Sequence, residues 1–246
     1  MLINPTIEKL HELGLTGMAD ALEQQLQIPD VISLSFEDRL GMLIDHEATA
    51  RANKLLKSRL KTAKLKQTAC VEDLNFLQTR GLDKATIKQL STCQWVKDHL
   101  NVLIAGKTGV GKTYLACALA HKACQQGFNV LYVRAPRLIN DLALARANGT
   151  YNSMLTTLAK KDVLVVDDFG LVPLNDEMAR DLLEVMDDRT GVRSTIVASQ
   201  LPIEAWHETI TNATVADAIL DRVVHSAYKL KLKGETMRDP KNNTEH

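Results

Sequence analysis

The sequence predicts an α/β protein in which a parallel sheet is sandwiched by helices and is preceded by a small all-helical N-terminal domain. From residue 101 onward, short and continuously apolar runs alternate with helical patterns, as is typical of a parallel sheet that is buried on both faces. Before residue 67 the apolar residues recur at helical spacing instead. We therefore predict a helical domain over 1–66, bridging helices over 67–100 and the α/β domain over 101–246.

The predicted N-terminal domain contains two helices. The first is ended by Pro29, and its apolar residues at helical spacing are Leu10, Leu13, Met18, Leu22 and Leu26. Ser35 is predicted to cap the second helix, with Asp38 three residues later as a weak capping box. That helix continues into a basic segment over 51–66, which contains no acidic residue.

Apolar runs and helical patterns alternate in the predicted α/β domain. The predicted strands cover 102–105, 130–133, 163–166 and 194–200, and each is an apolar run bounded by turn residues. Helical patterns lie between them at 114–126, 136–147 and 176–189. The carboxyl ends of parallel strands meet at one edge of such a sheet, and α/β proteins bind their ligands there.

Composition bounds the class of protein. The formal net charge is zero, so no overall field favours a polyanionic partner. The four cysteines form no C-x-x-C pair, which indicates reduced thiols rather than disulfides or a zinc site. The N-terminus has a proline and charges where a signal peptide needs an apolar core, and no apolar run approaches the roughly 18–20 residues that would span a membrane. We expect a cytoplasmic protein without a membrane partner.

A glycine-rich turn follows the first predicted strand and opens a predicted helix. It fits G-x-x-x-x-G-K-[ST] without a gap and consists of Gly106, Lys107, Thr108, Gly109, Val110, Gly111, Lys112 and Thr113, followed by Tyr114. Glycines allow successive backbone N–H groups to turn toward a phosphate, and the helix presents its positive N-terminus to the same anion. In this pattern the lysine reaches the β- and γ-phosphates, and the threonine hydroxyl coordinates Mg²⁺. We therefore predict that the chain binds ATP with Mg²⁺ and hydrolyses it.

Two neighbouring carboxylates follow the predicted strand at 163–166. Asp167 is expected to hold Mg²⁺, and Asp168 is placed to polarise the attacking water. The alternative is a strand-end turn in which both carboxylates are solvated. Gln200 ends the strand at 194–200, where a polar side chain can touch the γ-phosphate or the water. The triplet at 168–170 matches the D-F-G of protein kinases, but no other kinase motif accompanies it.

Two basic sets favour contact with DNA. In the first, a three-four-three spacing puts Lys54, Lys57, Lys61 and Lys64 on one helix face. The second set surrounds the helix predicted at 136–147 and consists of Arg134, Arg137 and Arg146. Only 4% of the residues are aromatic and none is interleaved with these sets, which favours a duplex backbone over stacked single-stranded bases. The alternative for each set is an ordinary solvated helix face.

These features together resemble AAA+ ATPases, and more closely the IstB-like ATP-binding proteins of insertion sequences, which are related to DnaC-type helicase loaders. The resemblance covers nearly the whole chain, and it includes the P-loop and residues 13–22, 166–170, 198–202, 221–225 and 231–238. It implies a AAA+ core with catalytic roles for Lys112, Asp168 and Gln200, the last at the sensor 1 position. It also implies an arginine finger at Arg222, which reaches a neighbouring subunit's nucleotide, and a sensor 2 role for Arg238 beside bound nucleotide.

The resemblance further implies a homo-oligomer that assembles with ATP on double-stranded DNA and helps a partner transposase of the same element. Two departures from most AAA+ enzymes matter: Asp168 replaces a glutamate, so basal hydrolysis is expected to be slow without DNA or transposase, and the short chain after Arg222 leaves no room for a C-terminal helical lid. The alternatives are a DnaC-type helicase loader that prefers single strands, a small-molecule kinase, and a nucleotide switch that hardly turns ATP over.

Overall fold

The computed structural model describes residues 4–28, 31, 33–74, 76 and 81–237. Contacts divide the chain into two compact units, residues 1–58 and 59–246. The division falls inside one continuous helix, α3 (Phe36–Ala63), so the helical pattern by itself does not mark the boundary between the units. None of the helices in the described part of the chain is long and apolar enough to cross a membrane.

Tight contact between two helices holds the N-terminal unit together. The unit contains α1 (Asn4–Glu12), α2 (Thr16–Gln27) and the first part of α3. A Cβ atom on Gly17, near the start of α2, would lie 2.8 Å from both the Cα of Glu47 and the Cβ of Ala50 in α3. The Glu47 carboxylate, which is buried, accepts a hydrogen bond from the Met18 N–H at 3.1 Å. The close approach of α2 and α3 therefore requires glycine at position 17.

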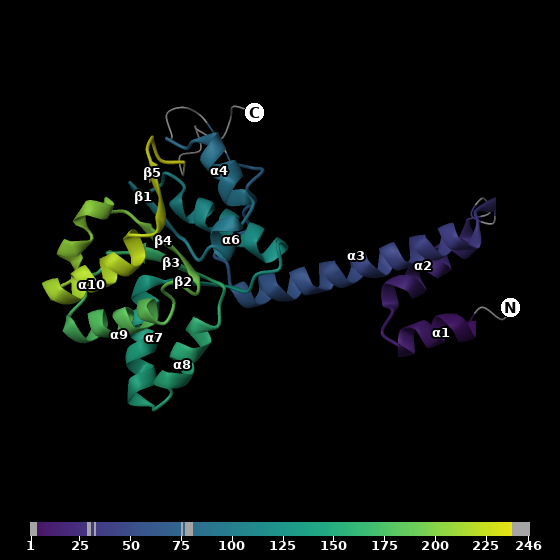
Figure 1. Ribbon diagram of the computed structural model, residues 1–246, viewed down its shortest axis with the longest axis horizontal. Coiled ribbons are helices and arrows are strands. Elements are labelled where there is room, and N and C mark those ends of the chain that lie inside the picture. Colours follow the sequence, from purple (N-terminus) through teal and green to yellow (C-terminus); the bar gives the residue numbers. More distant parts are fainter. Residues whose placement is uncertain (1–3, 29–30, 32, 75, 77–80, 238–246) are drawn as a thin grey trace. The chain divides into compact units, whose positions relative to one another are not determined.

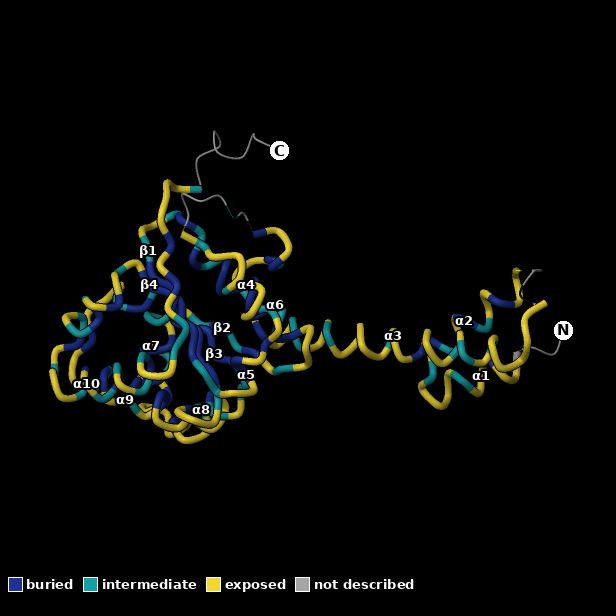
Figure 2. Tube along the Cα trace, turned by 45° about the horizontal axis from the view of Figure 1, so that its top comes forward, coloured by how far each residue is buried: buried dark blue, intermediate teal, exposed yellow. Residues whose placement is uncertain are grey.

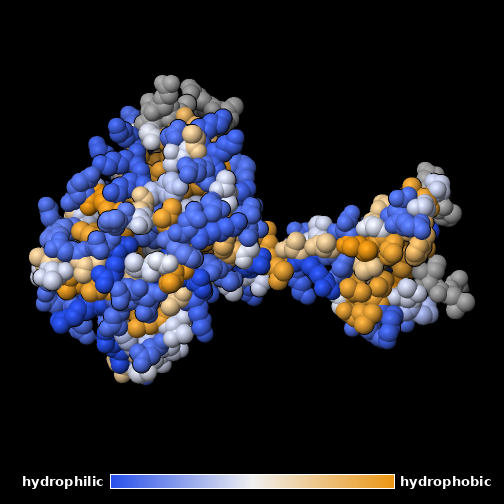
Figure 3. All heavy atoms as spheres, in the orientation of Figure 1, coloured by the Kyte–Doolittle hydropathy of each residue, from blue (hydrophilic) through white to orange (hydrophobic). Residues whose placement is uncertain are grey.

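The start of α3 is capped as the sequence predicted. The Ser35 hydroxyl accepts a hydrogen bond from the Asp38 N–H at 3.1 Å and donates to the Asp38 carboxylate at 2.8 Å. Figure 3 shows hydrophobic side chains gathered on the surface of this unit, where Leu13 and Phe36 are 63% and 73% exposed. Exposed apolar patches of this kind mark interaction surfaces.

Five parallel strands form the centre of the C-terminal unit. They are β1 (Asn101–Gly106), β2 (Val130–Arg134), β3 (Val163–Phe169), β4 (Ser194–Ser199) and β5 (Ala227–Leu232). Their order in the sheet is β2-β3-β4-β1-β5, and every neighbouring pair is parallel. Because β4 lies between β1 and β3, the carboxyl ends of these three strands are adjacent.

Helices cover both faces of this sheet (Figure 1). On one side lie α4 (Lys84–Ser91) and α6 (Lys112–Gln125), and on the other lie α7 (Ala135–Ala147), α8 (Tyr151–Ala159), α9 (Asp176–Asp187) and α10 (Ala213–Val224). The short turns are α5 (Gln94–Lys97), η3 (Ile203–Ala205) and η4 (His207–Thr209). The strands are buried through most of their length (Figure 2), and alternate residues such as Leu103, Leu164 and Val197 belong to the core beneath α7 to α10.

The sheet and its two helical layers confirm the predicted fold, but α8 and β5 were not predicted. β5 is an edge strand in which buried leucines alternate with exposed lysines, so it lacks the continuous apolar run of the other strands. Its partner is β1, with Leu103 opposite Lys229. In the described part of the chain, β5 and a turn are all that follow α10, so no helical lid is found there.

Gly17→Ala should destabilise the N-terminal unit by about 1–3 kcal/mol, because the added methyl group cannot fit between α2 and α3 unless backbone moves. Urea unfolding followed by circular dichroism measures this change. Gly41→Ala is the matched control, because a Cβ on Gly41 in α3 would meet nothing within 4 Å, and this variant should gain up to about 1 kcal/mol. Equal destabilisation by the two variants would contradict the tight helix crossing.

Candidate nucleotide-binding site

The glycine-rich loop joins the buried strand β1 to the N-terminus of α6. Gly109 has φ +86° and Gly111, which caps α6, has φ 95°, so the loop turns its backbone N–H groups toward one concavity. A Cβ on Gly109 would lie 2.1 Å from the Thr236 Oγ1, and the Met237 N–H donates to the Gly109 carbonyl at 2.9 Å. The segment that follows β5 is therefore packed against the phosphate-binding loop.

The lysine of the loop is held inside it. Lys112 is 8% exposed, and its Nζ donates to the carbonyl oxygen of Lys107 at 2.8 Å. A buried ammonium group at a helix N-terminus creates a strongly positive pocket. This charge is suited to a polyphosphate.

A buried carboxylate next to the loop connects three elements of the fold. The Asp167 Oδ2 accepts hydrogen bonds from the Thr113 hydroxyl at 2.8 Å and from the Tyr132 hydroxyl at 2.6 Å. The Asp167 Oδ1 accepts a hydrogen bond from the Asp168 N–H at 2.9 Å. Burial, and then the hydrogen bond to Asp167, raise the pKa of Tyr132, so its hydroxyl keeps its proton and acts as the donor. The structure thus brings together Thr113 and Asp167, the two predicted Mg²⁺ ligands.

The second carboxylate lies in a distorted part of β3. Asp168 has φ +60°, and the pairing of β3 with β4 shifts register between Val166 and Phe169. The extra residue forms a bulge, which turns the Asp168 side chain away from the regular strand direction. Its Oδ2 accepts a hydrogen bond from the Arg134 Nε at 2.7 Å. Arg134, predicted to contact DNA, is therefore paired with the carboxylate predicted to polarise water.

The polar residue that follows β4, Gln200, reaches the loop. The Thr108 hydroxyl donates to the Gln200 Oε1 at 2.7 Å, so the predicted sensor 1 side chain already contacts the phosphate-binding loop. Ser199 is buried, and its hydroxyl donates to the Phe169 carbonyl at 2.7 Å, which ties the ends of β3 and β4 together. The end of β4 is thus held between the loop and the two carboxylates.

Two residues that the sequence patterns did not indicate also line this concavity. They are Gln67 and Met237, which join Thr108, Gly109, Gly111, Lys112, Thr113, Tyr114, Asp168 and Gln200. Gln67 lies in the segment predicted as a bridge, so this segment contributes directly to the site. Gly106 ends β1, and Val110, a residue of the loop itself, is buried. Arg238, the predicted sensor 2 residue, lies outside the described residues.

ATP and Mg²⁺ fit this arrangement. Hydroxyl and carboxylate oxygens are the ligands that Mg²⁺ prefers, and Thr113 and Asp167 supply them at one point beside the loop. The loop, the α6 N-terminus and Lys112 together suit the phosphate chain. Asp168 and Gln200 lie on the same concavity, where a water attacking the terminal phosphate would be placed.

Comparison with known proteins gives the family. The profile described as IstB-like ATP binding protein matches residues 8–245. The chain belongs to this IstB-like family. A protein of Sinorhizobium fredii that is named an insertion sequence ATP-binding protein is 48% identical over 238 residues, which are 97% of this chain and 97% of that one.

Solved structures place the fold of this IstB-like protein. DnaI is 22% identical, with a TM-score of 0.58 over 67% of this chain and 91% of that chain. DnaA from Aquifex aeolicus with bound AMPPCP is 15% identical, with a TM-score of 0.57 over 70% of this chain and 52% of that chain. Together with the glycine-rich loop and the family, this likeness gives the sheet and its helices the fold of a AAA+ core. The family and this core together support ATPase activity for the chain.

Arg222 of the IstB-like protein lies far from the loop of its own subunit. Asn101, at the start of β1, donates from its Nδ2 to the Arg222 carbonyl at 3.2 Å, whereas the phosphate-binding loop follows the other end of β1. A strand of this length spans about 20 Å. The Arg222 guanidinium donates to the Asp187 carboxylate at 2.7 Å. An arginine finger at this position would act only on the nucleotide of another subunit.

The first basic set runs along the last three turns of α3 and ends just after the helix. Lys54, Lys57, Lys61 and Lys64 are all exposed, and none of them forms an ion pair with another residue in the described part of the chain. The helix ends at Ala63, and Lys64 has φ 53°, so Lys64 departs from the face that the other three share. Three of the predicted contacts therefore keep the helical spacing.

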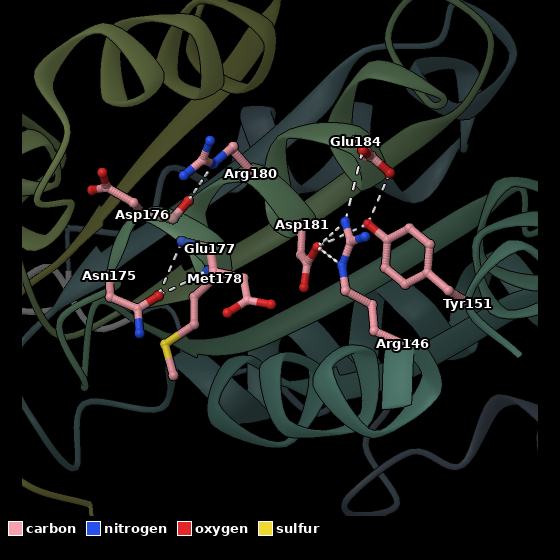
Figure 4. A network of polar contacts seen from close by, with 9 residues as sticks. All are labelled: Arg146, Tyr151, Asn175, Asp176, Glu177, Met178, Arg180, Asp181 and Glu184. Carbon is pink, nitrogen blue, oxygen red and sulfur yellow. Dashed lines mark hydrogen bonds and ion pairs between the residues drawn. The ribbon is translucent and has the colours of Figure 1, made fainter. Parts of the chain in front are cut away.

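The second basic set divides into three different environments. Arg137 is 80% exposed and lies 3.6 Å from Asp141, whereas Arg134 is engaged with Asp168. Arg146 lies over the Tyr151 ring, with 3.8 Å from the guanidinium carbon to the ring centre, and its Nε donates to Asp181 at 2.7 Å (Figure 4).

The polar cluster around Arg146 joins three helices of the domain. The Tyr151 hydroxyl lies 3.0 Å from the Asp181 carboxylate and 2.8 Å from the Glu184 carboxylate, and its one proton can be donated to either of them. The cluster thus joins α7, α8 and α9 (Figure 4). Asp181 is 2% exposed and depends on these partners for compensation of its charge. Arg146 therefore has a local structural role, and its contact with DNA stays a prediction.

Lys112→Ala should weaken ATP binding by about 100-fold, because the phosphates lose their buried cation. Equilibrium binding of a fluorescent ATP analogue measures this loss. Lys122→Ala is the control, because Lys122 lies on the same helix and pairs with Glu72 at 3.0 Å. Undiminished affinity in the Lys112 variant would overturn the assignment of the loop.

Proposed function

We propose that this protein is an ATP-dependent DNA-binding regulator that assembles as a homo-oligomer on duplex DNA and helps a partner transposase. The observation that carries the proposal is the ion pair between Arg134 and Asp168, because it links a predicted DNA contact to the predicted catalytic carboxylate. Membership of a family whose relatives are named for insertion sequences supports a role in transposition. The helper regulates the reaction and leaves strand cutting and joining to the transposase.

The ion pair offers a physical route from DNA to hydrolysis. A carboxylate that is paired with a guanidinium is a weaker acceptor for the proton of the attacking water. A DNA phosphate that binds Arg134, whose side chain is 50% exposed, would compete with Asp168 for the same cation. Release of Asp168 would then raise the rate of ATP hydrolysis. Slow turnover without DNA follows from the same contact.

Duplex DNA fits the basic surfaces better than single strands do. Lys54, Lys57 and Lys61 lie on one side of α3, and no aromatic residue is interleaved with them in the sequence to offer a surface on which bases could stack. Assembly is proposed because Arg222 lies at the end of β1 opposite the loop, so it can complete a nucleotide site only in another subunit.

Binding to long duplex and to single-stranded DNA, with ATP and then with ADP, tests this function while the size of each complex is measured. Large complexes on duplex with ATP, but not with ADP, are the expected result. A preference for single strands would favour a DnaC-type helicase loader. Absence of DNA binding in every nucleotide state would overturn both functions.

The same assay tests the first basic set, at the end of α3 and just after it, as a DNA contact. The test variant replaces Lys54, Lys57, Lys61 and Lys64 by glutamine. The slope of log K against log salt concentration should become less steep by about 3 to 4, because each lost phosphate contact removes about 0.9 from it. The control replaces exposed lysines at other places, namely Lys84, Lys88, Lys97 and Lys160, and changes the net charge equally. If both variants lowered the slope alike, overall charge rather than this helix would be responsible.

Arg134→Gln should raise the ATPase rate without DNA by about 2- to 5-fold, which is the factor that corresponds to the free energy of a partly exposed ion pair. The same variant should reduce the stimulation of the ATPase by duplex DNA. Phosphate release with and without DNA measures both effects. Arg180→Gln serves as the control, because Arg180 is exposed and bonds only the Asp176 carbonyl within the described contacts. A basal rate that stays the same in the Arg134 variant would contradict the coupling.

A further inference from the structure

A buried tyrosine in β2 reaches the carboxylate beside the phosphate-binding loop. Tyr132 is 7% exposed, and its hydroxyl lies 2.6 Å from the Oδ2 of Asp167, which is itself 1% exposed. β2 pairs with β3 so that Val165 is opposite Tyr132 and Asp167 is opposite Arg134. The Tyr132 side chain therefore contacts Asp167, which lies on the neighbouring strand two residues beyond Val165.

The hydrogen bonds of Asp167 leave it one defined orientation. Its two oxygens accept from three donors, namely the Tyr132 hydroxyl, the Thr113 hydroxyl and the Asp168 N–H. A carboxylate has about four lone-pair positions, so one remains for a further ligand. The carboxylate can only accept, so each hydroxyl must donate its proton to it. The Thr113 oxygen consequently keeps its lone pairs for a cation.

We propose that Tyr132 is a positioning residue that holds Asp167 in the orientation required for Mg²⁺ at the nucleotide site. The inference rests on the proposed roles of Thr113 and Asp167 as the residues that hold this ion. Tyr132 is not among the residues that line the concavity described above. Its effect passes through Asp167, as a partner behind a metal ligand fixes the ligand and sets its affinity.

A purely structural role would predict something different. If the Tyr132 hydroxyl only stabilises the core by its hydrogen bond, its loss would lower the melting temperature and leave the Mg²⁺ dependence of nucleotide binding unchanged. If it positions Asp167, its loss weakens the response to Mg²⁺ even when the fold is intact. The dependence of nucleotide binding on Mg²⁺ separates these two roles.

The test uses Tyr132→Phe in the full chain, which keeps the aromatic ring and removes only the hydroxyl. Binding of a fluorescent, non-hydrolysable ATP analogue is titrated at Mg²⁺ concentrations from EDTA to excess. We expect the Mg²⁺ concentration at half-effect to rise by about 10-fold, the lower end of the range for partners behind metal ligands. Affinity in EDTA should stay within about 2-fold of the parent protein, because the loop and Lys112 are untouched. An unchanged Mg²⁺ midpoint in a folded variant would overturn the proposal.

Two further variants make the result specific. Tyr228→Phe is the matched control, because the Tyr228 hydroxyl accepts a hydrogen bond from Gln89 at 2.9 Å and lies outside the nucleotide site; its Mg²⁺ midpoint should not move. Asp167→Asn should raise the midpoint at least as much as Tyr132→Phe. If Asp167→Asn shifts the midpoint and Tyr132→Phe does not, only the role of Tyr132 is overturned. If neither variant shifts it, the proposed Mg²⁺ site falls as well.

Discussion

The buried carboxylate of Asp167 is the interaction on which the rest of the site depends. It is 1% exposed, and a charge so far from water is tolerated only where hydrogen bonds or a cation compensate it. Thr113 brings the start of α6 to it, Tyr132 brings β2, and the backbone of Asp168 closes the contact within β3. Any movement of α6 relative to β2 would break a hydrogen bond to a buried charge. The position of the loop is therefore coupled to the sheet through one carboxylate.

The bulge in β3 gives the two neighbouring aspartates different environments. In a regular strand they would point to opposite faces, whereas the left-handed backbone of Asp168 turns its side chain toward the sheet edge, where it meets Arg134. A non-glycine residue in this conformation costs on the order of 1 kcal/mol or more, and the surrounding structure must offset that cost. The ion pair with Arg134 and the hydrogen bond between the Ser199 hydroxyl and the Phe169 carbonyl hold the bulge on both sides. One aspartate is thus fixed in the interior, and the other depends on a cation that a phosphate can attract.

Local patterns in the sequence predict the parallel sheet, the glycine loop and the two carboxylates, because each of these features depends on residues that are neighbours in the chain. The partners of these residues are distant in the chain: Tyr132 contacts a residue 35 positions away and Thr108 one 92 positions away. No periodicity reports such pairs, so the order of the strands must be known first. A count of basic residues also cannot reveal that Arg146 pairs with the buried Asp181, and its contact with DNA stays a prediction. The one local signal for Tyr132 is a tyrosine in an otherwise apolar predicted strand, two residues before Arg134.

Arg222 and the phosphate-binding loop lie at opposite ends of the sheet, so within one chain the arginine cannot reach the nucleotide site. The loop, Asp167, Asp168 and Gln200 lie at the carboxyl edge of the sheet, and Arg222 is attached to the amino end of β1 through Asn101. Asn101 also accepts a hydrogen bond from the Thr195 N–H at 2.8 Å, so this end of α10 is bound to the sheet and cannot swing to the other edge. If the guanidinium contributes to hydrolysis, it must leave Asp187 for a nucleotide held by another subunit. Hydrolysis would then depend on protein concentration and on any DNA that brings subunits together, while the first subunit alone would suffice to bind ATP.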